Sequence, residues 1–420
     1  MGLVDIAILG HVSVADLAGA AIGRSLGWSS ATLAMGIAMA LEPLASQALG
    51  AGNPERAWQA LIAALKGSVL VWLPTIAATF AVTYALEPFG VEHDVVLRAR
   101  AYLLGQSPGL LFMGVFMALK TFLQAHGRTR PALIAIVVAN IANAVICTLL
   151  VRGDDGLREL GLPVLGIRPL GALGAGLAYS IAQVVLVAIT FQAARWLRSG
   201  PGAKAEPMKV FSLLALGVPI GLQVLAEMGV FTLIAMIMGR LGKQVVSAHQ
   251  IAIGLASFTY MGALGVSGAT AVRVGRAIGE NRSPRRAGLL GIAVGAVVMS
   301  VGALSFALFP RYLIMIFTRD PLVIVLGSQL LLIAAAFQLF DGVQAVASGA
   351  LRGAGDVRFP FIVNLVAYWV LGLPIALILG FGLDWGARGL WWGLTLGLVC
   401  TSILLTRRFV VLSRGSIAKL

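Results

Sequence analysis

The chain has 420 residues, of which 59% are hydrophobic and only 11% are charged. Soluble domains carry about 25% charged residues, so this composition excludes a soluble protein with a single membrane anchor. A formal net charge of +14 would suggest nucleic acid in another context, but here the basic residues are scattered among short loops. The composition predicts an all-α polytopic membrane protein with no nucleic-acid partner.

One short fragment and eleven longer apolar runs follow one another along the chain. A helix that crosses a hydrocarbon core about 30 Å thick needs about 20 apolar residues. The predicted spans are 17–47, 59–86, 95–119, 131–151, 170–194, 210–239, 245–271, 288–309, 322–350, 360–380 and 386–406. The fragment 1–10 is too short to span, so we expect a complete first helix to start upstream or this copy to be truncated.

Two halves of the chain resemble each other weakly. The polar stretch 196–209 predicts a cytoplasmic linker between an N-terminal helical bundle, 1–195, with an incomplete first helix, and a C-terminal bundle, 210–420. Such a repeat predicts two pseudo-symmetric six-helix bundles with a substrate path at their interface. Most Lys and Arg residues fall on the side of the linker and the C-terminus, which predicts that this side is cytoplasmic.

Two carboxylates stand near the middle of apolar runs. Glu227 is the one charged residue in 210–239, and Asp341 is the one acidic residue in 322–351. A charge at the centre of a membrane helix costs roughly 2.5–3.5 kcal/mol on insertion scales. We therefore expect these carboxylates to bind a positively charged partner: an ion, a proton or a cationic substrate.

Polar side chains accompany both carboxylates at helical spacing. Gln338, Asp341, Gln344 and Ser348 form one stripe at intervals of 3, 3 and 4, and Gln223 lies one turn before Glu227. The candidates for a substrate cavity are Gln223, Gln338, Gln344, Asn140, Asn143, Gln183 and Tyr260. Asn140, Asn143 and Gln183 could equally hold helices together. Glu42 fits an interfacial carboxylate close to water or to an Arg, and His249 fits a structural histidine.

Enzyme motifs are poor. Residues 265–268 match the GxSG string of intramembrane serine proteases, but that chemistry needs a histidine on a later helix, and all four histidines precede it. Cys147 and Cys400 lie in apolar runs and indicate neither a disulfide framework nor a metal motif. The sequence predicts no enzyme and no cofactor. Because it holds no nucleotide-binding domain, uphill work would draw on an ion gradient.

Several segments resemble the multidrug and toxic compound extrusion (MATE) family, over essentially the whole chain. The segments that carry the resemblance are 3–11, 42–52, 217–227, 248–251, 273–275 and 351–356, and they are most similar to the NorM-type branch, with some DinF-like features. The resemblance implies the twelve-helix MATE architecture and an inner-membrane, monomeric exporter of organic cations. It implies alternating access driven by Na⁺ or H⁺.

The resemblance also implies roles for three carboxylates. Glu227 and Asp341 match the cation site of the C-terminal half, and Asp5 matches the first-helix carboxylate that titrates in other members. This chain departs from the family at Cys147, where some members carry Asp, and at Phe337, where some Na⁺-coupled members carry Tyr. The alternatives to multidrug export are a lipid-linked precursor flippase of the same superfamily, a channel and an intramembrane enzyme.

Overall fold

The computed structural model describes residues 2–10, 12–159, 161, 166, 168–198 and 206–420, and the regular structure in these residues is entirely helical. The helices in chain order are α1 (Gly2–Gly10), α2 (Val14–Gly50), α3 (Pro54–Thr83), α4 (His93–Ala125), α5 (Arg130–Arg152), α6 (Asp154–Glu159), α7 (Gly171–Arg195), α8 (Val210–Gly239), α9 (Lys243–Gly279), α10 (Arg285–Leu308), α11 (Pro310–Met315), α12 (Pro321–Gly353), α13 (Arg358–Leu365), η1 (Val366–Gly372), α14 (Leu373–Leu377), η2 (Ile378–Gly382) and α15 (Gly386–Leu412).

Eleven stretches of helix within the described residues are long and apolar enough to cross a membrane, and they coincide with the eleven predicted spans. The helices run past several predicted ends, because polar residues at a membrane surface continue a helix whose backbone is already hydrogen-bonded. The span Arg358–Gly382 is less regular than predicted: α13 and α14 alternate with the π-helical turns η1 and η2. Pro374 lies there and lacks the N–H that a regular helix would use.

The first compact unit comprises Met1–Leu41 and Pro54–Gly221. Within it α7 packs against both α4 and α5, and α1 packs against α5. Glycines set the distance between α4 and α7: a Cβ on Gly105 would lie 2.6 Å from the carbonyl oxygen of Leu173, and one on Gly176 would lie 2.3 Å from that of Tyr102. Only glycine permits backbones this close, which explains the small residues in these apolar runs.

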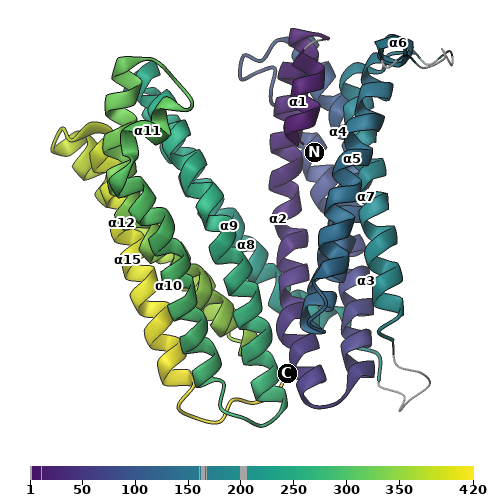
Figure 1. The fold of residues 1–420 in the computed structure, drawn as a ribbon, viewed down its shortest axis with the longest axis vertical. Helices are drawn as coiled ribbons and strands as arrows, with labels where there is room; N and C mark the ends of the chain where they lie inside the picture. The colour runs from purple at the N-terminus through teal and green to yellow at the C-terminus, as the bar shows by residue number, and fades with distance from the viewer. Residues whose placement is uncertain (1, 11, 160, 162–165, 167, 199–205) are drawn as a thin grey trace. The chain divides into compact units, whose positions relative to one another are not determined.

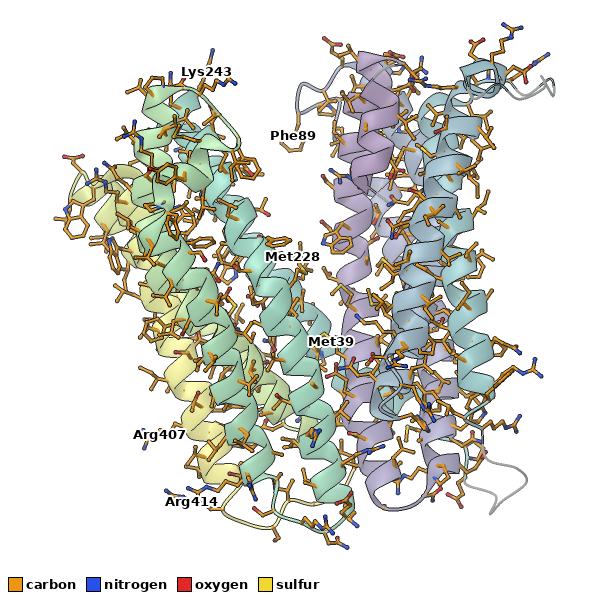
Figure 2. The ribbon with its side chains drawn as sticks, in the orientation of Figure 1. Met39, Phe89, Met228, Lys243, Arg407 and Arg414 are labelled. Carbon is orange, nitrogen blue, oxygen red and sulfur yellow. The ribbon has the colours of Figure 1, made fainter. Side chains whose placement is uncertain are left out.

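The second compact unit comprises Glu42–Asn53 and Leu222–Leu420. Its central helix is α12, which packs against α9, α10 and α15, and these four helices run side by side in Figure 1. Gly349 and Gly353 of α12 face backbone carbonyls of α9. In Figure 2 Lys243 lies at one end of this unit, and Arg407 and Arg414 lie at the opposite end.

The two units differ in two segments from the bundles expected from the sequence. The end of α2 groups with the second unit, and the start of α8, up to Gly221, groups with the first. Both helices are long enough for their two ends to pack on different neighbours. The division at the linker 196–209 stays a prediction, and residues 199–205 of that linker lie outside the described residues, as does His11.

Candidate functional site

The second unit holds the pair of carboxylates that the sequence singles out. Asp341 on α12 is 7% exposed, Glu227 on α8 is half-buried, and the two lie close enough for their charges to interact. Among the described residues, neither carboxylate forms an ion pair. Both acids therefore sit in an apolar bundle without a fixed counter-charge, where ionisation is costly unless a cation binds.

Amide groups on α12 flank Asp341 on both sides. The Nε2 of Gln338 donates to the carbonyl oxygen of Ala256, at 3.2 Å, and to the hydroxyl of Thr259. The Nε2 of Gln344 donates to Oδ1 of Asn364 at 3.0 Å. Within the described part of the chain, the buried Oε1 atoms of both glutamines have no hydrogen-bond partner. Their donors are thus engaged while their acceptors remain available to a ligand.

Two tyrosines and a third glutamine complete this cluster. Gln223 is buried and its Nε2 donates to the hydroxyl of Ser348 at 3.4 Å, which ties α8 to α12. Tyr260 is half-buried, and its hydroxyl is close enough to both carboxylates to interact with them electrostatically. Tyr368 of η1 is buried and is also close enough to both carboxylates to interact with them electrostatically. Its hydroxyl has no hydrogen-bond partner among the described atoms. Sequence reasoning missed Tyr368; its one signal was a lone tyrosine in an apolar span.

A second group of predicted residues lies in the first unit. Asp5 on α1 is 2% exposed and adjoins Asn143 and Cys147 of α5, which are both fully buried. Gln183 on α7 is buried and lies beside the hydroxyl of Tyr179. The predicted residues thus fall into two polar clusters, one in each unit.

Other predicted residues have local roles. The amide of Asn140, a predicted cavity residue, donates to the carbonyl of Ile136 one turn earlier in its own helix, at 2.7 Å. His249 is buried, and its Nδ1 accepts a hydrogen bond from the indole N–H of Trp391 at 3.2 Å. This bond fits the structural role expected for the histidine.

The GxSG serine and Glu42 both hold helices together. The hydroxyl of Ser267 is buried and donates to the carbonyl oxygen of Ala345 at 2.7 Å, which ties α9 to α12. Glu42 has the Arg partner that the sequence allowed, Arg352, but the pair is buried rather than close to water. The serine string is therefore part of the helix packing.

Carboxylate, amide and hydroxyl oxygens surround the Asp341 cluster. Oxygen donors of this kind suit hard cations and protons rather than soft metals. The cluster could bind one small cation or proton, or the charged group of an organic cation, and each would offset one of the two negative charges.

Comparisons with known proteins agree with this architecture. The MatE family model matches residues 1–149 and 219–378. The chain belongs to the MatE family. It is 33% identical over 430 positions to the probable multidrug resistance protein NorM of Pseudomonas putida, covering 97% of this chain and 89% of the relative. It is 34% identical over 428 positions to the protein of the same name from Deinococcus radiodurans, covering 99% and 92%.

Solved structures of MATE transporters share the fold. The eukaryotic MATE transporter AtDTX14 superposes with a TM-score of 0.82 at 23% identity, covering 98% of this chain and 92% of that one. The outward-facing conformation of a multidrug resistance MATE family transporter gives 0.82 at 18% identity, covering 98% and 91%. The expected twelve-helix MATE architecture is confirmed, and the chain is a multi-pass membrane protein.

Proposed function

We propose that this MatE-family chain is a secondary active multidrug exporter that exchanges amphipathic organic cations for Na⁺ or H⁺ by alternating access. The observation that carries the proposal is the cluster of Glu227 and Asp341, two acids in apolar helices without an ion-pair partner among the described residues. An uncompensated buried carboxylate favours any state in which a cation or proton neutralises it.

Exchange follows if the coupling ion and the organic cation compete for this charge. Binding of the ion at Glu227 and Asp341 would favour one orientation of the transporter, and binding of the organic cation would favour the other. The relatives named multidrug resistance protein support the substrate class. We place the protein in the inner membrane as a monomer, with the arginine-rich C-terminal end, which includes Arg407 and Arg414, in the cytoplasm.

The test is efflux of ethidium from proteoliposomes under an imposed Na⁺ or H⁺ gradient. Glu227→Gln and Asp341→Asn remove one negative charge each at nearly constant volume, and we expect each to abolish gradient-driven transport while membrane expression is retained. The matched control is Glu206→Gln, which removes an exposed carboxylate outside the helices and should transport like the parent. Full transport by either site variant, or an ethidium efflux rate that depends on neither the Na⁺ nor the H⁺ gradient, would reject the proposal.

A further inference from the structure

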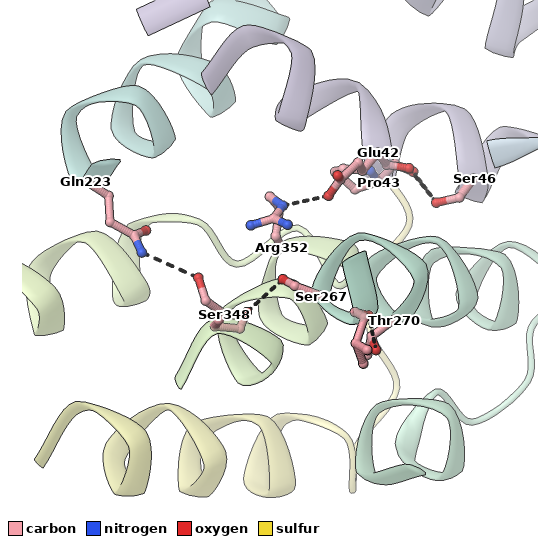
Figure 3. Close-up of polar contacts among 10 residues, drawn as sticks. Glu42, Pro43, Ser46, Gln223, Ser267, Thr270, Ser348 and Arg352 are labelled. Atoms are coloured by element: carbon pink, nitrogen blue, oxygen red, sulfur yellow. Dashed lines mark hydrogen bonds and ion pairs between the residues drawn. The ribbon is translucent and has the colours of Figure 1, made fainter. Parts of the chain in front are cut away.

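The second unit contains a buried ion pair whose two members lie far apart in the sequence. Nε of Arg352, at the end of α12, donates to Oε2 of Glu42 at 2.7 Å (Figure 3). Each residue is 5% exposed, and 310 positions separate them along the chain. Two charges taken out of water attract each other strongly only while they remain in contact, and removal of one leaves the other buried and unpaired.

The end of α2 that carries Glu42 is tightly seated. Nε2 of Gln47 donates to the carbonyl oxygen of Gly353 at 3.2 Å, immediately after Arg352. Glycines of α9 make room for α2: a Cβ on Gly279 would lie 2.2 Å from the carbonyl oxygen of Gln47. The segment Glu42–Asn53 is thus held against α9 and α12 by the Glu42–Arg352 ion pair, the hydrogen bond from Gln47 and close backbone contact.

This seated segment begins where α2 passes from one compact unit to the other. Residues up to Leu41 belong to the first unit, and Glu42 starts the part that belongs to the second. Pro43 follows at once and is internal to the helix, so the carbonyl of Met39 lacks its usual N–H partner. Helices bend most easily at such positions. The ion pair therefore lies next to the position at which α2 bends most easily.

A polar stripe links the ion pair to the carboxylate cluster. Arg352 continues the spacing of the α12 stripe, four residues after Ser348 and eleven after Asp341. Eleven residues make about three helical turns, so both sites lie on one face of α12, about 16 Å apart along its axis. Between them Gln223, one turn before Glu227, bonds to Ser348, as Figure 3 shows.

From these contacts we propose that Glu42 and Arg352 form a charge latch that opens and closes once in each transport cycle, with Pro43 as the adjoining hinge. The proposal rests on the alternating access proposed above. While the latch is closed, segment 42–53 covers the ends of α9 and α12. When it opens, the segment swings away about Pro43 and both charges regain water, so the intact pair favours the closed state.

The test measures exposure of the segment without substrate or ion gradient, so that it stands even if export fails. Ser46, fully buried four residues after Glu42, is replaced by Cys in a chain that also carries Cys147→Ala and Cys400→Ala. Labelling by a membrane-impermeant maleimide is followed in vesicles with this end exposed. We expect Glu42→Gln to raise the labelling rate on the order of tenfold or more, because Arg352 is left unpaired when the latch is closed.

Two further variants make the result specific to the pair. The double variant Glu42→Arg with Arg352→Glu restores opposite charges and should bring the labelling rate back toward that of the parent. Arg408→Gln breaks the Arg408–Asp356 ion pair, which is 2.8 Å long in the same unit but exposed on its Arg side, and should leave the rate unchanged.

If Glu42→Gln fails to reach the membrane, Arg352→Lys takes its place. This variant keeps the charge but loses the planar guanidinium, so the labelling rate should rise by a smaller factor than for full loss of charge. An unchanged rate in whichever single variant is folded would overturn the latch. Equal acceleration by Arg408→Gln, or no recovery in the charge-swapped double variant, would overturn it as well, because either result makes the effect a general loosening.

Discussion

The contact between α2 and the start of α8 allows a sharp test of the packing. Both segments belong to the first unit, and a Cβ on Gly36 would lie 2.3 Å from the backbone N of Gly221 and 2.4 Å from the carbonyl oxygen of Gly217. These distances are about 1 Å short of the 3.4 Å at which ordinary contact begins. Because the obstructing atoms are backbone, no side chain can rotate away, and Gly36→Ala must push the two helices apart.

The magnitude follows from two opposing effects. Overpacking of a well-packed interface costs about 1–3 kcal/mol. Replacing glycine by alanine within a helix returns roughly 0.5–1 kcal/mol from backbone entropy. Gly254→Ala in α9 is the matched control, because nothing lies within 4 Å of its Cβ position and only the second effect operates. Relative to this control, Gly36→Ala should be less stable by about 1–3 kcal/mol.

Thermal stability in detergent measures the difference. Each purified variant is heated in steps, and the fraction that remains monodisperse is read by fluorescence-detected size-exclusion chromatography. The midpoint for Gly36→Ala should fall below that of the parent, while the midpoint for Gly254→Ala should match or exceed it. If the two alanine variants prove equally stable, the close backbone contact between α2 and α8 is not a determinant of the fold and the reasoning fails.

Two other substitutions test separate contacts. Ser267→Ala removes the hydroxyl that donates to a carbonyl of α12, so it should lower the stability by about 0.5–1.5 kcal/mol in the same assay and leave ethidium efflux measurable. Complete loss of activity with an unchanged midpoint would instead indicate a catalytic serine. Asp16 accepts hydrogen bonds from Arg98 at 3.1 Å and from the backbone N of Ala172 at 3.0 Å. Asp16→Ala should therefore cost about 1.5–3 kcal/mol. Asp94→Ala, which removes a mainly exposed partner of the same arginine, should cost less than about 1 kcal/mol, and equal midpoints for the two variants would contradict this account.

Hydropathy predicts the spans well because a membrane helix must satisfy its backbone internally, whatever its neighbours are. Hydropathy does not determine the local geometry of each helix. The π-helical turns around Pro374 depend on how freed carbonyls are accommodated, and an apolar run does not encode that choice visibly. The change of unit within α2 and α8 also escaped prediction, since it depends on which neighbours each half of a long helix finds.

Side chains on one helix were predictable, and side chains that meet across helices were not. The spacing of Gln338, Asp341 and Gln344 places them on one face, and the structure has all three buried there. Tyr368 joins them from η1, where no periodicity marks a lone tyrosine in an apolar run. The amide of Asn140 donates to a carbonyl of its own helix, and its role in a substrate cavity stays a prediction.

Arg352 belongs to the same polar stripe of α12 as Ser348 and Asp341. One more step of four residues beyond Ser348 reaches this arginine, and burial of an arginine at 5% exposure demands a partner. Glu42 near the end of another span is that partner. Each charge, taken alone, fits an ordinary residue of a helix end close to water. Together they form a pair whose separation costs free energy. Such a free-energy difference can keep a transporter in one state until ligand binding outweighs it.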